Sequence, residues 1–169
     1  MENTIYIIGQ VLGIVAVILG FISFQMKSQY GIIVMQCATG FVFSAHYFFI
    51  SAPTAVVLNL VTAFICVFYA FRNKKQSKNI MEVVVTVAII VVAGLFAWES
   101  VYSLLLIAGL ALHTISLSLT RPQSTRKLVF FKSPLCFAYN ILVGSIGGVI
   151  FECVVLSSAI IGLIKNRGK

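Results

Sequence analysis

The sequence predicts an all-α integral membrane protein of seven transmembrane helices, built as two parallel three-helix repeats joined by an inverting helix. Three observations predict this fold: the composition, the spacing of the apolar segments, and the connections in which the basic residues fall. Of the 169 residues, 60% are hydrophobic and 9% are charged, whereas soluble domains carry about 25% charged residues. A chain this short cannot bury so much apolar side chain in a water-soluble core, so we expect the apolar residues to face lipid.

Seven segments are long and apolar enough to be spanning helices, since a span needs roughly 20 mostly apolar residues. Turn or charge signals separate them, and their ranges are 5–25, 30–50, 53–71, 80–98, 101–119, 128–144 and 146–164. The breaks near residues 51 and 145 are short and uncharged, which predicts two helical hairpins, 30–71 and 128–164. A six-helix alternative places 80–98 at the membrane surface, but the length and apolarity of that segment argue against it.

The basic residues fall in alternate connections between these segments and in the C-terminal tail. They are Lys27, Arg72, Lys74, Lys75, Lys78, Arg121, Arg126, Lys127, Lys165, Arg167 and Lys169. The connections on the other side contain Glu2 and Glu99 and no Lys or Arg. By the positive-inside rule, this distribution predicts seven spans with the N-terminus outside and the C-terminus in the cytoplasm.

The net charge of +8 is therefore interpreted as a topology signal and not as a nucleic-acid patch, and we expect contact with lipid head groups instead. Lys132 lies just inside the sixth segment, where we expect its side chain to reach the cytoplasmic head groups. Glu82 lies among basic residues at the same side of the membrane, so a local salt bridge is predicted for it.

An internal repeat relates residues 1–75 to residues 95–169 without a gap. In this alignment Gln29 meets Gln123, Phe43 meets Phe137, His46 meets Asn140 and Ser51 meets Ser145. The predicted units are 1–75, a linker helix at 76–99, and 100–169, and both repeats enter the membrane from the same side. Parallel three-helix repeats around one inverting helix are a transporter layout, with the solute path between the repeats.

Pro122-Gln123 at the cytoplasmic end of the fifth helix, with Ser28-Gln29 at the equivalent place in the first, adds a resemblance to this layout. The chain resembles the bacterial inner-membrane YgjV family, within the wider PQ-loop and SWEET-like transporter superfamily. The resemblance implies a bacterial inner-membrane location and hinges at Pro122, Gln123 and Gln29. It also implies that aromatic and Asn residues hold the solute.

The solute-binding residues implied by the resemblance are Phe43, Phe137 and Asn59. The counterpart of Asn59 in the last helix is Cys153, with Glu152 beside it.

Polar residues inside the predicted spans indicate a site independently of the resemblance. His46, Asn59, Asn140 and Glu152 all come to roughly 7–11 Å below the outer face at the helical rise of about 1.5 Å per residue. Such a layer can form a polar pocket, with hydroxyls from Tyr47 and Tyr139 and with ring stacking by Phe43 and Phe137. The alternatives are hydrogen bonding between helices for Asn59 and Asn140, and a structural role for His46. For Glu152 the alternatives are a structural pair with His46 or a protonated acid.

These features predict a transporter of a small polar solute such as a sugar, an amino acid or a nucleoside-like compound, working by alternating access as a facilitator or with ion coupling. The rival interpretation is a non-transporting membrane scaffold that binds a partner. Enzymatic motifs are absent, and the four cysteines lack metal-ligand spacing, so we expect no catalysis, cofactor or metal. Two GxxxG pairs, Gly9/Gly13 and Gly144/Gly148, predict close helix packing, with a homo-oligomer as the alternative.

Overall fold

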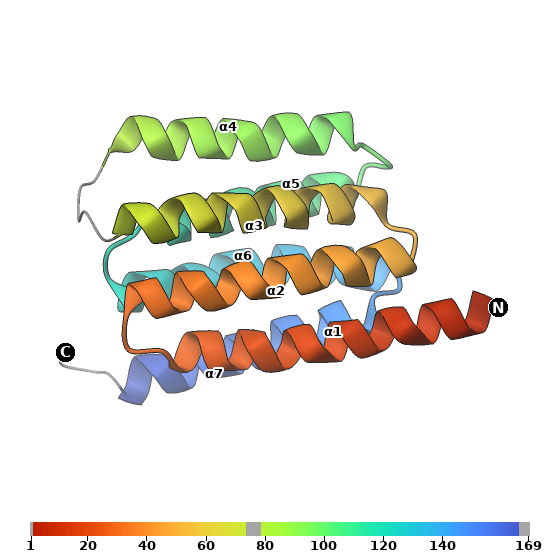
Figure 1. The fold of residues 1–169 in the computed structure, drawn as a ribbon, viewed down its shortest axis with the longest axis horizontal. Helices are drawn as coiled ribbons and strands as arrows, with labels where there is room; N and C mark the ends of the chain where they lie inside the picture. Colours follow the sequence, from red (N-terminus) through yellow and green to blue (C-terminus); the bar gives the residue numbers. More distant parts are fainter. Residues whose placement is uncertain (1, 74–78, 166–169) are drawn as a thin grey trace.

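The computed structural model describes residues 2–73 and 79–165 (Figure 1). Within these ranges it contains seven α-helices and no strand. The helices are α1 (Glu2–Gln25), α2 (Gln29–Phe49), α3 (Pro53–Asn73), α4 (Ile80–Phe96), α5 (Ser103–Leu117), α6 (Pro122–Leu142) and α7 (Ile146–Lys165). All seven predicted helices are present, and the start of α6 is the one bound that differs from its prediction by more than three residues.

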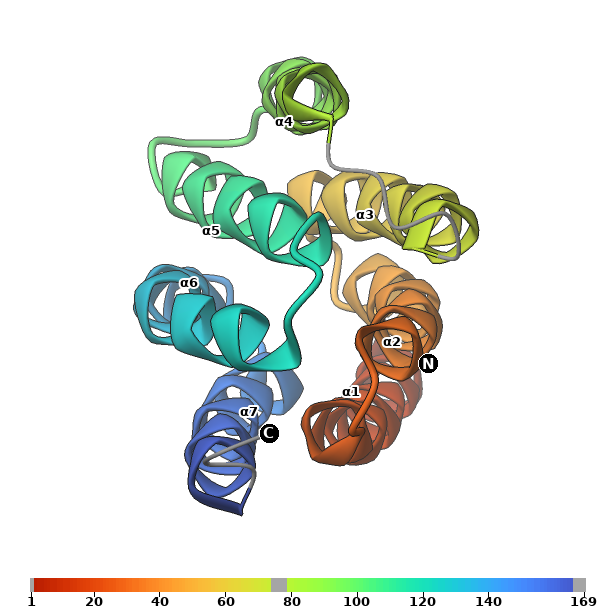
Figure 2. The same cartoon turned by 90° about the vertical axis from the view of Figure 1, so that its left-hand side faces the viewer.

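Six of the helices form a closed ring around the centre of the molecule, and α4 lies outside it (Figure 2). Around the ring, α1 packs on α2, α2 on α3, α3 on α5, α5 on α6, α6 on α7, and α7 on α1. The larger contacts of α4 are with α3 and α5. The first three helices and the last three therefore meet along two seams, α1 with α7 and α3 with α5.

The outer surface of the bundle is apolar along its length. Each helix exposes large hydrophobic side chains, for example Ile7, Phe48, Phe64, Phe96, Leu104, Phe131 and Ile164. Helices α1, α2, α3 and α7 are long and apolar enough to cross a membrane, and α4 and α5 are shorter apolar helices. Helix α6 is more polar, because Arg126 and Lys132 are buried in the bundle and Lys127 is exposed near its start. The exposed residues further along α6, such as Phe130, Phe131 and Ile141, are apolar. This is the surface expected of a helical membrane protein.

The start of α6 differs from the prediction, which placed it at 128 and read the preceding polar stretch as a connection. Arg121 is the N-cap in extended conformation, and Pro122 occupies the first turn. Proline suits that position because its missing amide hydrogen has no helical partner there and its fixed φ already fits the helix. Thr125 and Arg126 are consequently helical and buried.

The turn between α2 and α3 and the turn between α6 and α7 are built alike. Ser51 has φ 58° and Gly144 has φ 68°. The amide of Ala52 donates to Tyr47 O at 3.0 Å, and the amide of Ser145 donates to Asn140 O at 2.9 Å. Pro53 begins α3 and Ile146 begins α7, so equivalent positions lie 93 residues apart. The predicted alignment used a shift of 94, one residue more than these turns have.

The glycine pairs behave differently from one another. A β-carbon on Gly13 would lie 3.0 Å from the Cα of Gly147, so these two glycines let α1 and α7 approach closely. Gly9 likewise lies against Phe49 of α2. Gly144 lies in the turn before α7 at positive φ, so the second GxxxG pair is not a helical packing motif.

The α1–α2 turn, the α5–α6 turn and the end of α7 lie at one end of the bundle (Figure 1). It is called here the basic end, because Lys27, Arg121 and Lys165 fall in these segments. Lys74, Lys75, Lys78, Arg167 and Lys169 lie outside the described residues. The salt bridge predicted for Glu82 is confirmed, since its Oε2 lies 2.5 Å from Nε of Arg72. At the opposite end, Glu99 accepts a hydrogen bond of 2.9 Å from the amide of Thr54 in the first turn of α3.

Candidate functional site

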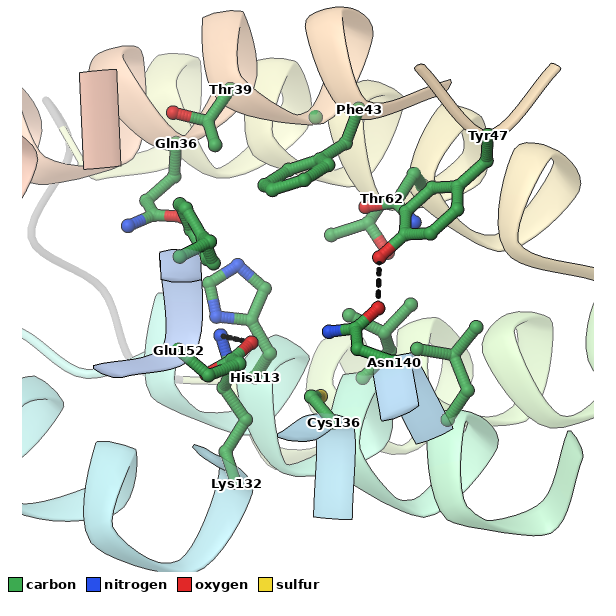
Figure 3. Close-up of a pocket in the computed structure, with 15 residues that line it drawn as sticks. Gln36, Thr39, Phe43, Tyr47, Thr62, His113, Lys132, Cys136, Asn140 and Glu152 are labelled. Atoms are coloured by element: carbon green, nitrogen blue, oxygen red, sulfur yellow. Dashed lines mark hydrogen bonds and ion pairs between the residues drawn. The ribbon is translucent and has the colours of Figure 1, made fainter. Parts of the chain in front are cut away.

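A polar cavity lies inside the ring of helices, among α2, α3, α5, α6 and α7 (Figure 3). It offers about 40 Å³ to water-sized molecules, which is room for a few waters and well below the roughly 300–1,000 Å³ of a pocket for a drug-sized ligand. Its lining residues are Gln36, Thr39, Gly40, Phe43, Tyr47, Asn59, Thr62, Leu106, Leu110, His113, Lys132, Cys136, Asn140, Phe151 and Glu152. The first three and the last three helices both contribute polar groups.

An ion pair forms part of the cavity wall. Lys132 Nζ lies 3.3 Å from Glu152 Oε1, and the two side chains are only 7% and 4% exposed. Ser133 donates a hydrogen bond of 2.6 Å to the other carboxylate oxygen of Glu152. The ammonium also lies 5.4 Å from the ring centre of Phe151, a distance at which a cation is attracted to an aromatic face. Each charge is therefore compensated locally, as buried charges must be.

A hydrogen bond crosses the cavity from the first three helices to the last three. The hydroxyl of Tyr47 on α2 donates to Oδ1 of Asn140 on α6 at 2.5 Å, and both side chains are buried. Gly148 on α7 makes room for this amide, because a β-carbon there would overlap Asn140. In Figure 3 this bond lies toward one side of the cavity, and Lys132, His113 and Glu152 gather toward the other.

The wall formed by α2 and α3 is polar but uncharged. Asn59 donates from Nδ2 to Ala55 O at 2.8 Å, and Thr39 and Thr62 donate their hydroxyls to carbonyls four residues earlier, at 2.8 and 2.7 Å. Gln36 donates to Ser23 Oγ of α1 at 2.8 Å. The cavity thus has an ionic wall on α6 and α7 and a neutral polar wall on α2 and α3.

Comparison with known proteins assigns the chain to a family. A model of the family Imp-YgjV, described as bacterial inner membrane protein, matches residues 7–169. The chain belongs to the Imp-YgjV family. It is therefore a bacterial inner-membrane protein, in agreement with the apolar helices of the fold. Searches of curated proteins and of solved structures gave no match.

Five of the predicted solute-binding residues of this Imp-YgjV protein line the cavity. They are Phe43, Tyr47, Asn59, Asn140 and Glu152. The turn geometry, with its shift of 93 residues, makes Glu152 the positional counterpart of Asn59, whereas the alignment had assigned Cys153 to that place. Cys153 is exposed on the outer face of the bundle.

His46 does not line the cavity. It is fully buried between α1 and the α6–α7 turn, with Nδ1 2.7 Å from Gly9 O and Nε2 2.7 Å from Ser145 Oγ. Because a carbonyl oxygen only accepts hydrogen bonds, Nδ1 donates, and Nε2 of the neutral ring accepts from the serine. The histidine therefore ties three elements together, which corresponds to the structural alternative stated for it.

Phe137 and Tyr139 also lie away from the cavity. Phe137 is half-buried on α6, and Tyr139 is fully buried, with its ring centre 6.3 Å from that of Tyr102. Of the aromatic pair predicted to stack on a solute, only Phe43 is in place, and its ring stacks on Tyr47 with centres 5.6 Å apart.

The predicted hinge residues lie at the starts of α6 and α2, not at the ends of the helices before them. Gln29 donates to Ser116 O at 3.4 Å and accepts from the hydroxyl of Thr125 at 3.0 Å, so it joins α2 to α5 and α6. Gln123 accepts from Nη1 of Arg126 at 3.3 Å. Gln29 and Gln123 thus belong to the contacts that close the basic end of the Imp-YgjV bundle, and Pro122 begins α6 at that end.

Sequence reasoning missed Lys132 and Arg126 as interior residues. The expectation that Lys132 reaches the head groups is wrong, since its side chain is buried against Glu152. Helical spacing carried the signal: Lys132, Cys136 and Asn140 follow one another at intervals of four residues, the spacing of the broad buried stripe of a helix, so they share the inward side of α6. A structural pair with His46 was one of the alternatives for Glu152, and its actual partner is Lys132.

Among the described residues no group of three or more His, Cys, Asp or Glu side chains is placed to hold a metal ion. The chemistry that the cavity offers is therefore binding by one cation, one anion and several neutral hydrogen-bonding groups.

Proposed function

We propose that this Imp-YgjV protein transports a small polar solute by alternating access, with the polar cavity as the solute site. The observation that carries the proposal is a buried cavity at the centre of an apolar bundle, lined by an ion pair and by amide groups from both the first three and the last three helices. Ionisable groups inside a membrane bundle mark solute and ion pathways more often than they mark simple packing.

The proposed architecture consists of two parallel three-helix units, α1–α3 and α5–α7, with α4 as the inverting helix and all seven helices crossing the membrane. The matching turns and helix starts, 93 residues apart, support this arrangement, as does the position of α4 outside the ring. The basic end is proposed to face the cytoplasm, in accord with the positive-inside rule, so that the N-terminus lies outside. The layout is the one that the PQ-loop and SWEET-like resemblance implies.

Alternating access requires contacts that close the cavity at each end and that can be broken in turn. At the basic end, Arg126 of α6 donates from Nε to Phe24 O at 3.1 Å and from Nη2 to Met26 O at 2.7 Å, both at the end of α1. Phe24 O is among the last four carbonyls of α1, which have no partner within the helix, and Met26 lies just beyond the helix end. Water can replace the guanidinium there, so the contact can open without leaving the carbonyls unpaired.

At the opposite end, a second set of contacts joins α1 and α2 to the α6–α7 turn. Tyr6 donates to Gly144 O at 3.3 Å, Gln10 accepts from the amide of Gly147 at 3.1 Å, and His46 bonds Ser145. Rocking of the two units about Pro122 and Gln29 would open one set of contacts while the other stays closed.

The test of the proposal is uptake into proteoliposomes containing the purified protein, with a panel of sugars, amino acids and nucleosides. We expect saturable uptake of at least one solute class, abolished in Asn59→Ala and Asn140→Ala but retained in Ser157→Ala, whose hydroxyl lies on the exposed face of α7. A folded wild-type protein that takes up none of the panel would favour the non-transporting scaffold, in which the same amides only join helices.

A further inference from the structure

The Lys132–Glu152 pair is an unusual way to build the interior of a small membrane bundle. Both side chains are more than nine-tenths buried, and they lie on neighbouring helices, α6 and α7. Apolar residues of similar volume would hold α6 against α7 at least as well, because desolvating two charges costs as much as their attraction returns. The pair also borders a cavity, where apolar packing would have been a simpler way to stabilise the fold. Its position therefore points to a ligand.

The charges are confined to one wall of the cavity. At the equivalent positions of the first three helices, 93 residues earlier, Lys132 is matched by Thr39 and Glu152 by Asn59, and both also line the cavity. A ligand between the walls thus meets opposite charges on one side and neutral hydrogen-bonding groups on the other.

Charge balance selects among the solutes that this cavity can hold. A neutral solute that separates the pair leaves two buried charges without partners, and an ionic solute of one sign leaves one. A zwitterion supplies a carboxylate to the ammonium and an ammonium to the carboxylate, so every charge keeps a partner and the site stays neutral. In an α-amino acid both groups are bonded to one carbon, which puts them a few ångströms apart, on the scale of the 3.3 Å between Lys132 Nζ and Glu152 Oε1.

We propose that Lys132 and Glu152 bind the carboxylate and the ammonium of a small zwitterionic α-amino acid, an assignment that rests on the proposed transport function and names its substrate class. Lys132 receives the carboxylate while it remains over the ring of Phe151. Glu152 receives the ammonium and remains bonded to Ser133. The ion pair closes again when the solute leaves, so the empty carrier has no unpaired charge as it changes access. The limited room of the cavity, about 40 Å³, favours a short side chain.

The test is a thermal-shift titration of the purified protein in detergent with the individual L-amino acids, glucose and uridine. A solute that binds only the folded state raises the melting temperature with its concentration. For alanine, the matched probes are ethylamine, which lacks the carboxylate, and propionate, which lacks the ammonium. We expect stabilisation by small amino acids, and binding at least about 30-fold weaker for either matched probe, since each leaves a buried charge without a partner.

Two double variants separate a ligand site from a structural ion pair. Lys132→Met/Glu152→Met removes both charges together and is expected to stay folded and to lose the amino-acid response. Arg72→Met/Glu82→Met removes the other ion pair of the described residues, which lies between α3 and α4 away from the cavity lining, and is expected to keep that response.

Each alternative outcome has a distinct meaning. Stabilisation by glucose or uridine but not by amino acids overturns the assignment and leaves the transport proposal standing. An unchanged amino-acid response in the Lys132/Glu152 double variant overturns the site. A folded wild-type protein that ignores every solute contradicts both proposals.

Discussion

Removal of one member of the buried ion pair is the sharpest perturbation that the structure suggests. In Lys132→Met the carboxylate of Glu152 stays buried at 4% exposure and keeps only the hydrogen bond from Ser133. Loss of one partner from a buried pair costs about 3–5 kcal/mol. The retained hydrogen bond to a charged group is worth about 1.5–3 kcal/mol, so we expect a loss near the lower limit, about 3 kcal/mol in the free energy of unfolding.

The double variant Lys132→Met/Glu152→Met should recover most of that loss, because no charge is then left without a partner. We expect it within about 1 kcal/mol of the wild type. With about 3 kcal/mol lost in each of the single variants Lys132→Met and Glu152→Met, the double-mutant cycle then gives a coupling energy of about 5 kcal/mol. Equilibrium unfolding in detergent, followed by the helical circular dichroism signal, measures all three variants. Lys127→Met is the matched control, since Lys127 is exposed on the same helix and should change stability by less than about 0.5 kcal/mol. If Lys132→Met costs no more than this control, the pair does not stabilise the fold as described.

Three further perturbations test contacts at different depths, each by the same unfolding measurement. Tyr47→Phe removes the 2.5 Å hydrogen bond to Asn140 and leaves a buried acceptor, so a loss of about 1–2 kcal/mol is expected, and a neutral result would mean that water replaces the hydroxyl. Arg126→Met removes the donors that close the basic end, so it should lower the free energy of unfolding by about 3 kcal/mol. It should also speed amide hydrogen exchange at the start of α2, and unchanged exchange there would contradict the closing role. Gly144→Ala forces a β-carbon into φ 68° with no neighbour within 4 Å, so backbone strain alone should cost about 1 kcal/mol, and a gain in stability would show that the turn has another conformation.

The fold was predictable from the sequence to the extent that single helices are independent of one another. Apolar segments of spanning length can be recognised in the sequence alone, so composition and turn signals predict the helices and both hairpins. The start of α6 was predicted at the wrong residue because Pro122 and Arg126 lie in a polar stretch that resembles a loop. In the structure this proline is in the first turn of the helix. A basic residue near a helix end is normally drawn to the head groups, and nothing local reveals that Arg126 instead meets carbonyls of α1.

The candidate site was predictable only in part, because the sequence gives the depth of a residue along its helix but not the direction in which its side chain points. Tyr47 and His46 are adjacent in sequence and at similar depth, yet they point about 100° apart around α2, one into the cavity and the other toward Gly9 of α1. The same rotation separates Phe137 from Cys136, which lines the cavity. Which face points inward depends on how the seven helices pack, and that packing lies beyond the periodicity of any one of them.

The most direct measurement of the central claim uses a thiol that the chain already has in the cavity. Cys136 is buried on α6 and lines the site, and replacing Cys37, Cys66 and Cys153 by Ala leaves it as the sole thiol. A small membrane-impermeant thiol reagent is then applied to one side of sealed vesicles at a time. Alternating access predicts that Cys136 is labelled from either side and that a transported solute slows both reactions. Labelling from neither side, in a protein that remains folded, would contradict the account.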